Sequence, residues 1–542
     1  MLPQQLLAPY LTPQQAALLS YEEVLPVSMV TQLCERLRAE LIAIRTLVAD
    51  PVARGHRLIE RHEGGYCPGS LLCADLSGFT GLTEQLATQG RQGVEELSTI
   101  INRLFGALLE EIGLYGGVVL KFSGDALTVF FDEAQVGTQH RALACAAAFA
   151  LQQRIAAFAD METSSGLRTL RLRIGVHSGR IFLAALGDDT RRELFVAGTD
   201  VNRANLAQEH ALPGEILISA ETLNGLGQAR STARPDGFIH LSEAPAFVDH
   251  VVPPPALAVP DATDMATALT LAEQLATLRP FLPRDFPQRF IDVAHDNAPG
   301  EFRPVTVLFI TFSSFSKLLA FCEGAESLAV QAVNAYYTRV QKVIHSYGGT
   351  INKLDVASFG ERLLALFGAP VAHEDDPLRA VQAALDLRAA LQEANREIAS
   401  LLAAAGRFQL NEDTELAFSG LDQRIGIATG TVFAGLVGGP DRREYTVIGQ
   451  TVNLAARLMA IGAPDQVLLS PAAWRAVQSH IALQPLPPRL LKGIPKPVSA
   501  ALALHPIGQT AQPLVAQSMP FVGREAELAI LRAQMNDALN GL

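Results

Sequence analysis

The chain has 542 residues, of which 49% are hydrophobic and 18% are charged, and its formal net charge is −12. This composition is typical of a globular protein with several domains and excludes a disordered chain. The acidic balance disfavours general binding to nucleic acid, and no uncharged apolar run reaches the ~20 residues that a membrane-spanning helix needs. We therefore expect a cytoplasmic protein without a nucleic-acid or membrane partner.

Residues 1–65 show a helical pattern without recognisable chemistry, so we expect a helical N-terminal extension. The five cysteines lack the paired spacing of a metal site, and their number is odd. This usage predicts reduced, buried thiols, as in cytosolic proteins.

The sequence repeats itself at a constant offset of 251 residues. RIGVHSGRIFLAALG at 173–187 returns as RIGIATGTVFAGLVG at 424–438, and RRELFVAGTDVNRANLA at 191–207 returns as RREYTVIGQTVNLAARL at 442–458. The same offset in separate blocks indicates a duplicated domain. The preceding leaders, LAPYLTP and LRPFLPR, also resemble each other.

The two copies are predicted at 66–235 and 300–507, joined by a Pro- and Ala-rich linker at 236–299. Each copy has a strand, an amphipathic helix (94–114 and 328–347), a Gly-Gly turn into a hairpin, a further helix and an RIG strand. This β-α-β-β-α-β order predicts an α+β, ferredoxin-like fold. We expect the two sheets to cover each other as a pseudo-symmetric heterodimer within one chain, and hence a monomer.

The first copy carries two carboxylates at predicted strand ends. Asp75 follows an apolar strand and opens DLSGFT, and Asp125 lies in KFSGD at a hairpin tip. Taken singly, they would be a helix cap and a turn residue, but together they suit a pair of Mg²⁺ ions. The turn that follows Asp75 precedes a helix and offers backbone N–H groups to a triphosphate. That turn consists of Ser77, Gly78, Phe79 and Thr80.

The second copy differs at both positions. Thr311 aligns with Asp75, and the stretch after Lys353 is four residues longer and has no SGD. We therefore expect the second copy to lack the carboxylates.

Instead, the second copy carries Asn453 and Arg457 at i,i+4 spacing on one helix face. An arginine there can stabilise the charge that develops at a phosphorus atom. The first copy keeps Asn202 but has Leu206 opposite Arg457. The two copies are thus complementary.

Taken together, DLSGFT, KFSGD, YTVIGQTVNLAARL and the LKG at 491–493 resemble class III adenylyl and guanylyl cyclases. The resemblance is greatest to the soluble, bicarbonate-responsive adenylyl cyclases and their bacterial relatives with tandem domains. It covers most of the chain, residues 66–507. It implies an enzyme that converts ATP into cyclic AMP, a signalling molecule, at one site between the copies.

The resemblance also implies the roles of individual residues. Asp75 and Asp125 would bind two Mg²⁺ ions, which Mn²⁺ could replace, with help from the Leu76 carbonyl. Asn453 would orient the ribose, and Arg457 would stabilise the transition state. The remaining substrate contacts would come from Arg173 and Lys492 on the phosphates and from Lys353 and Thr446 on the purine.

Two alternative functions stay open. A guanylyl cyclase of the same fold is disfavoured by Lys353 and Thr446, which do not match the Glu/Cys pairing linked to guanine. A catalytically silent nucleotide-sensing module that regulates a C-terminal ATPase is disfavoured because both carboxylates, Asn453 and Arg457 are all present.

The resemblance places a second, non-catalytic cleft between the copies, and we expect it to be regulatory. In the resembling cyclases this cleft binds bicarbonate through a lysine and an arginine. Lys121 matches the lysine, whereas Asn205 stands at the arginine position and Arg203 lies two residues earlier. A neutral amide holds an anion less firmly than a guanidinium, which disfavours bicarbonate and leaves another small regulator as an alternative ligand. Val196 and Val356 would complete this cleft.

Residues 508–542 form a predicted linker and the start of another domain. MPFVGREAELAILRAQM at 519–535 resembles the opening of an AAA-type or STAND-type ATPase. No phosphate-binding loop follows, so we expect a catalytic fragment that precedes an ATPase region.

Overall fold

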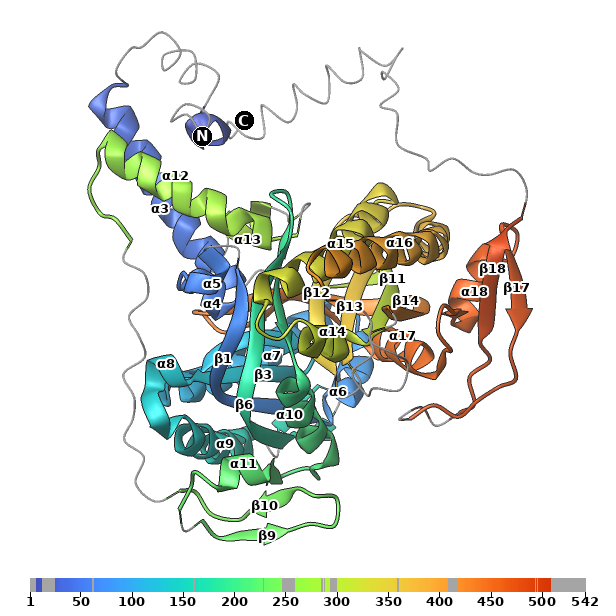
Figure 1. Cartoon of the computed structure of the whole chain (residues 1–542), viewed down its shortest axis with the longest axis horizontal. Coiled ribbons are helices and arrows are strands. Elements are labelled where there is room, and N and C mark those ends of the chain that lie inside the picture. The colour runs from blue at the N-terminus through green and yellow to red at the C-terminus, as the bar shows by residue number, and fades with distance from the viewer. Residues whose placement is uncertain are drawn as a thin grey trace.

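A computed structural model provides the fold, and Figure 1 shows two sheet-and-helix halves beneath a projecting pair of helices. The structure describes residues 6–11, 25–60, 63–158, 161–164, 166–227, 229–245, 259–283, 286, 288–292, 300–357, 360–407, 418, 420–492, 494 and 496–507. The segment at 508–542, including the ATPase-like sequence, lies outside these residues.

The first copy forms an eight-stranded sheet with the order β2-β3-β1-β6-β8-β10-β9, and β7 pairs with β6. The core order β2-β3-β1-β6 is that of the expected ferredoxin-like unit. The sheet continues past residue 235 through β10. Its strands are β1 (Gly64–Ser77), β2 (Val118–Ser123), β3 (Ala126–Asp132), β6 (Arg171–Gly187), β7 (Arg192–Ala197), β8 (Ile216–Ile218), β9 (Ser231–Ala233) and β10 (Ile239–Leu241). A separate hairpin joins β4 (Met161–Thr163) to β5 (Gly166–Arg168).

The second copy repeats this sheet with the order β12-β13-β11-β14-β16-β18-β17, and β15 pairs with β14. Its strands are β11 (Glu301–Ser313), β12 (Thr350–Ala357), β13 (Gly360–Phe367), β14 (Asp422–Gly438), β15 (Arg443–Ile448), β16 (Val467–Leu469), β17 (Ile481–Pro485) and β18 (Ala501–Pro506). The duplication inferred from the sequence is therefore a duplication of the whole sheet topology.

Most helices cover one face of each sheet. Those of the first copy are α6 (Phe79–Ala87), α7 (Arg91–Leu114), α8 (Glu133–Val136), α9 (His140–Ile155), α10 (Thr199–His210) and α11 (Ala220–Leu223), with η2 (Gly137–Gln139) and η3 (Ala156–Phe158). Those of the second copy are α14 (Phe315–Phe321), α15 (Glu326–Ser346), α16 (Asp376–Ala404), α17 (Gln450–Ile461) and α18 (Pro471–Val477). Helices α10 and α17 pack against the opposite face. The helices predicted at 94–114 and 328–347 correspond to α7 and α15.

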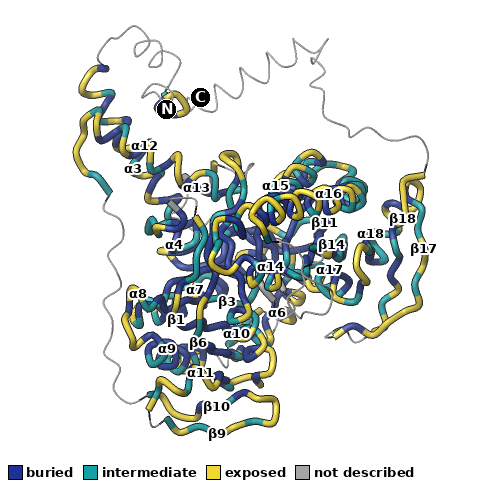
Figure 2. Tube along the Cα trace, viewed as in Figure 1, coloured by how far each residue is buried: buried dark blue, intermediate teal, exposed yellow. Residues whose placement is uncertain are grey.

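Both faces of each central strand are buried, and this explains their nearly continuous apolar sequence. In β1, Leu72 packs beneath the helices of the first copy. Its neighbour Leu71 faces the opposite way, into a core that also contains Val307 and Phe309 of the second copy. Figure 2 shows this buried interior running between the halves. The two copies therefore share one core and hold the clefts between them in a fixed geometry.

Strand register identifies the equivalent positions in the two copies. Asp75 pairs with Ala126 and Arg173, and Thr311 pairs with Arg362 and Arg424. Thr311 is thus the counterpart of Asp75, as predicted. The register also makes Glu361 the counterpart of Asp125, because both precede the strand residues just paired.

The expectation that the second copy lacks both carboxylates is therefore wrong at one position. In the β2–β3 hairpin the last strand pair is Ser123–Ala126, and a two-residue turn joins these residues. The β12–β13 hairpin continues further, to the Ala357–Gly360 pair. These extra strand pairs add four residues to the second copy, so a direct alignment of the two sequences does not match Glu361 with Asp125.

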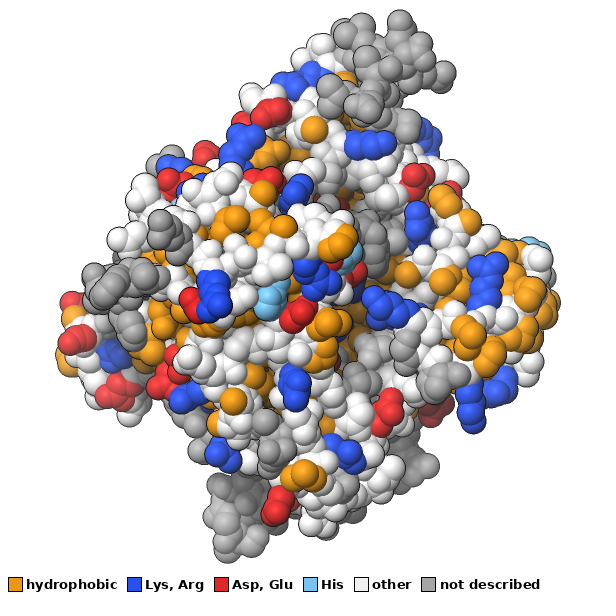
Figure 3. Space-filling view, turned by 90° about the horizontal axis from the view of Figure 1, so that it is seen from below, with side chains coloured by type: hydrophobic (Ala, Val, Ile, Leu, Met, Phe, Trp, Pro, Cys, Tyr) orange, Lys and Arg blue, Asp and Glu red, His pale blue; other side chains and the backbone are white. Residues whose placement is uncertain are grey.

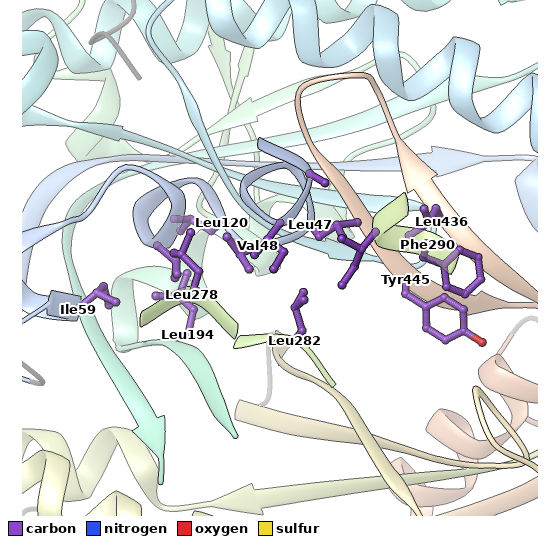
Figure 4. Packing of buried hydrophobic residues seen from close by; sticks show 14 of the residues in the cluster. Leu47, Val48, Ile59, Leu120, Leu194, Leu278, Leu282, Phe290, Leu436 and Tyr445 are labelled. Atoms are coloured by element: carbon purple, nitrogen blue, oxygen red, sulfur yellow. The ribbon is translucent and has the colours of Figure 1, made fainter. Parts of the chain in front are cut away.

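The segments that precede the two copies pack against each other. They comprise η1 (Ala8–Tyr10), α3 (Val27–Leu47), α4 (Asp50–Ala53), α5 (Arg57–Glu60), α12 (Met265–Leu278), η4 (Arg279–Phe281) and α13 (Gln288–Asp292). The similar leaders predicted from the sequence both contain a short 3-10 helix, η1 and η4. Figure 4 shows Leu47 and Leu282 from these segments in one apolar cluster with Leu194 of the first copy and Tyr445 of the second.

The face in Figure 3 carries basic and acidic side chains interspersed, with apolar side chains gathered toward the side of β17 and β18. All five cysteines are free and buried, as predicted. Within the part of the chain that the structure describes, no helix is both long and apolar enough to span a membrane.

Candidate active site

One cleft lies between the copies and is lined by residues of both. The first copy contributes the β2–β3 turn, and the second contributes the faces of β11, β12 and β13 together with β15 and the start of α17. Its lining residues are Ser123, Gly124, Asp125, Phe309, Lys353, Asp355, Arg362, Leu364, Thr446, Val447, Ile448, Gly449, Val452, Asn453 and Ala456. We call this the substrate cleft.

The two carboxylates of the first copy lie at neighbouring strand ends. Asp75 is near the end of β1, and Asp125 follows Gly124, whose φ of +74° makes the tight turn possible. The N–H of Leu76 donates to the carbonyl of Asp125 at 3.2 Å, which ties the two ends together. Burial, and then the charge of Asp75, raise the pKa of Asp125 to about 7.

This arrangement fits divalent cations, because a positive charge beside two half-buried carboxylates relieves both desolvation and mutual repulsion. Among the described residues, no group of three or more acidic, histidine or cysteine side chains is arranged to hold a metal. An ion at Asp75 and Asp125 would therefore need further oxygen ligands, such as the Leu76 carbonyl, water and phosphate. In the structure Asp75 instead accepts from Arg173 Nε at 3.1 Å. Arg173, predicted to contact phosphate, thus forms an ion pair with Asp75.

The turn after Asp75 leads directly into α6. Gly78 caps this helix with a φ of +95°, and a Cβ there would lie 2.9 Å from the carbonyl of Thr169, so glycine is required. Ser77 ends β1, and Phe79 is fully buried beneath the helices. The side chain of Thr80 is outside the described residues. The turn therefore brings the start of α6 beside the carboxylates.

Helix α17 of the second copy carries Asn453 and Arg457 on one face. Asn453 lines the substrate cleft together with Asp125. Burial, followed by the charge of Arg362, lowers the pKa of Arg457, whereas Glu209 and Asp75 act in the opposite direction. The structure thus places Asn453 at the cleft with Asp125, whereas Arg457 lies outside the cleft lining and interacts with Asp75 only electrostatically.

The two predicted purine-binding residues, Lys353 and Thr446, also line the substrate cleft. Lys353 Nζ donates to Glu444 Oε1 and to the carbonyl of Phe122, both at 2.5 Å. Thr446 lies two residues after Glu444, and its buried hydroxyl has no hydrogen-bond partner among the described residues. An unpartnered hydroxyl facing a cavity favours a polar ligand. Lys492 is exposed and does not line the cleft, so its phosphate contact stays a prediction.

The residues predicted for the second cleft differ from one another in burial and in the contacts that they make. Lys121 is buried, with Nζ 3.5 Å from Glu193 Oε1, and Val196 lies in the shared core. Asn205 donates to the carbonyl of Val201 at 3.0 Å. Arg203 is exposed, 3.9 Å from the Glu221 carboxylate, and the side chain of Val356 is outside the described residues.

The second cleft also differs where the substrate cleft has its polar groups. Phe195 is the register counterpart of Thr446, and its ring lies 5.1 Å from that of Phe315. Leu206 stands at the position of Arg457. An apolar ring pair and a leucine therefore replace the unpartnered hydroxyl of Thr446 and the guanidinium of Arg457.

Sequence reasoning did not identify Asp355 and Arg362 as residues of the substrate cleft. Asp355 Oδ2 accepts from Arg362 Nε at 3.2 Å and Nη2 at 2.8 Å, and its Oδ1 accepts from Ser123 at 2.6 Å. No motif marks this pair, because its residues lie on different strands of an extended hairpin.

The chain belongs to the family described as the adenylate and guanylate cyclase catalytic domain, whose pattern matches residues 66–245 and 298–501. It is 25% identical over 533 residues to adenylate cyclase type 10 of Oryctolagus cuniculus, covering 92% of this chain and 31% of the relative. It is 26% identical over 446 residues to adenylate cyclase type 10 of Homo sapiens, covering 77% of this chain and 25% of the relative. The chain thus spans about a third or less of the length of these relatives.

A solved structure supports the fold. It is titled a class III adenylyl cyclase-like ATP-binding protein from Pseudomonas aeruginosa. The TM-score is 0.52 at 15% identity, and the match covers 76% of this chain and 85% of that one. The likeness extends over both copies and therefore supports the tandem arrangement.

Proposed function

We propose that this chain is an adenylyl cyclase, which converts ATP into 3′,5′-cyclic AMP and pyrophosphate at the substrate cleft. One observation carries the proposal: Asp125 of the first copy and Asn453 of the second line the same cleft, with Asp75 at the strand end beside Asp125 and Arg457 one turn after Asn453 on α17. The counterpart positions of the other cleft have Thr311 and Leu206 instead of Asp75 and Arg457.

Asp75 and Asp125 would hold two Mg²⁺ ions, or Mn²⁺ in their place, and the Leu76 carbonyl would add a ligand. Bound there, such ions would lower the pKa of the ribose 3′-hydroxyl and neutralise the charge of the triphosphate. The substrate cleft thus combines carboxylates, which would hold cations for the phosphates, with the polar groups of Lys353 and Thr446, which suit a base.

The residues of the second copy would position the rest of the substrate. Asn453 orients the ribose so that its 3′-oxygen faces the α-phosphorus in line with the pyrophosphate. The new bond joins the 3′-oxygen to the α-phosphorus, and the bond to the pyrophosphate oxygen breaks, while the hydroxyl proton passes to solvent. Arg457 stabilises the charge at the phosphorus during this displacement. Arg173 and Lys492 would contact the departing phosphates.

Lys353 and Thr446 support adenine as the base. A lysine held by Glu444 and a hydroxyl with an open hydrogen-bond capacity can both reach the edge of a purine. The relatives named adenylate cyclase point in the same direction. The second cleft would be regulatory, with bicarbonate or another small regulator bound near Lys121, and the chain would act as a cytoplasmic monomer.

The proposal is tested by incubating the purified chain with ATP or GTP in Mg²⁺ or Mn²⁺ and measuring cyclic nucleotide and pyrophosphate. We expect cyclic AMP from ATP, its loss in Asp75→Ala, and retention in Thr311→Val, which alters the counterpart position. Cyclic GMP as the main product would make the purine assignment wrong. ATP binding without product, at any bicarbonate concentration, would favour the catalytically silent module.

A further inference from the structure

The substrate cleft is lined by an ion pair that has no equivalent in the first copy. Asp355 on β12 and Arg362 on β13 face each other in register and bind through two hydrogen bonds. At the equivalent rung of the first copy, Ser123 pairs with Ala126. The asymmetry matches that of the proposed catalytic groups, because the pair lies only on the copy that faces the carboxylates.

Asp355 holds the arginine firmly. Its carboxylate is 5% exposed, and Ser123 of the other copy donates to its second oxygen at 2.6 Å. Although burial alone would raise it, Arg362 and Ser123 hold the pKa of Asp355 below its usual range. The Phe309 ring lies 5.9 Å from the guanidinium carbon and supports it from another side. A guanidinium fixed in this way keeps its orientation when a ligand arrives.

The other edge of Arg362 is available to a ligand. A guanidinium has five N–H donors, and Asp355 takes one from Nε and one from Nη2. No further acceptor contacts Arg362 in the described part of the chain, and Arg362 lines the cleft with Asp125 and Asn453. The available donors therefore belong to a residue that lines the same cleft as Asp125 and Asn453.

We propose that Arg362 is a substrate-contacting residue whose available N–H groups bind the phosphate chain of the nucleotide, with Asp355 as its positioning residue. Planar guanidinium groups suit phosphate oxygens because they donate two parallel hydrogen bonds. The surroundings agree, since Arg362 acts electrostatically on both Asp125 and Arg457. This inference rests on the proposed function, because it assigns a further contact within the same site.

Calorimetric titration of the full chain in Mg²⁺ tests the proposal, with α,β-methylene-ATP and inorganic tripolyphosphate as probes. Arg362→Gln should weaken both probes about 10-fold or more, as expected for lost charge-assisted hydrogen bonds. Arg339→Gln is the matched control: Arg339 Nη2 lies 2.6 Å from Glu397, and its side chain is 29% exposed against 24% for Arg362. It lies on α15, away from the cleft, and should leave both affinities unchanged.

A second variant tests whether the loss in Arg362→Gln arises only because the buried Asp355 carboxylate has lost its partner. Asp355→Ser with Arg362→Ala copies the residues of the first copy and removes both charges together. It should show the same loss for both probes. Weakened nucleotide binding with normal tripolyphosphate binding would place Arg362 at the base or ribose and overturn the proposal, as would unchanged binding of both probes.

The same experiment distinguishes a failure of the proposed function from a failure of the inference about Arg362. Wild-type chain that binds the probes but forms no cyclic nucleotide from ATP would contradict only the cyclase assignment. Wild-type chain that binds neither probe would contradict both statements.

Discussion

Asp125 and Glu361 occupy equivalent positions of the two copies, and both have a pKa raised to about 7, but for different reasons. Burial acts on both, whereas the charge of Asp75 acts only on Asp125. Glu361 is 1% exposed, and its Oε1 has no hydrogen-bond partner among the described residues. Duplication thus left a carboxyl group on each hairpin, with a second acidic residue beside only one of them.

Glu361 should make stability depend on pH. Its folded-state pKa of about 7 exceeds its ordinary value of 4.5, so the folded chain binds this proton more tightly than the unfolded chain. The stabilising effect is complete below pH 4.5 and is lost as pH rises through 7. Glu361→Gln should therefore be more stable than wild type at pH 8, by at most about 3 kcal/mol, and similar at pH 4.5. Urea unfolding across this range measures the difference, and parallel pH profiles of the two proteins would contradict it.

Glu444 should position Lys353 for the purine. Glu444→Gln removes the carboxylate that lies 2.5 Å from Lys353 Nζ, and we expect kcat/KM for ATP to fall ~10-fold or more, with a smaller preference for ATP over GTP. Glu193→Gln is the matched control, since Glu193 contacts Lys121 at 3.5 Å in the mirror-image position. Equal losses in the two variants would indicate a structural role shared by both pairs.

Asn453 and Asn202 allow a similar comparison between the two copies. Asn453 lines the substrate cleft, whereas Asn202 donates to Ser316 at 3.5 Å. Asn453→Ala should lower kcat ~10- to 100-fold, because the ribose loses its orientation, while Asn202→Ala should change it less than about 3-fold. Steady-state kinetics with thermal melting as a folding control measures both. A larger loss in Asn202→Ala would move catalysis to the other cleft.

Removal of divalent cations should abolish turnover. Chelation removes the ions that would lower the pKa of the ribose 3′-hydroxyl and neutralise the triphosphate, and no cyclic AMP should form until Mg²⁺ or Mn²⁺ is restored. Asp125→Asn should reduce kcat/KM at least ~100-fold at any Mg²⁺ concentration. Activity that persists in chelator would show that the two carboxylates have another function.

The sequence was sufficient to predict the duplicated topology. The constant offset between the RIG strands located β6 and β14, and apolar periodicity located α7 and α15. The presence of Asp125 and Asn453 at one cleft could be predicted because their motifs are long and each copy has what the other lacks. Strand order followed, since a βαββαβ arrangement leaves few ways to pair its strands.

Other features depend on register and contact. Glu361 lies within the extended β12–β13 hairpin, so a direct alignment of the two sequences does not match it with Asp125. Asp355 and Arg362 are seven residues apart, and only the hairpin shows that they form a pair. Arg173 matched a phosphate contact, yet the strand beside it presents Asp75 as its partner. Side-chain pairing across strands has no fixed spacing in sequence.

The pairing of α3 with α12 has a consequence for synthesis on the ribosome. Cys34 and Arg38 of α3 contact the carbonyls of Asp264 and Pro260, beside α12, more than 200 residues later in the chain. At about 5–20 residues per second, α3 emerges on the order of 10–40 s before its partner. Its apolar face therefore awaits α12 while the entire first catalytic domain is translated, and the helix pair closes only after that domain has been made.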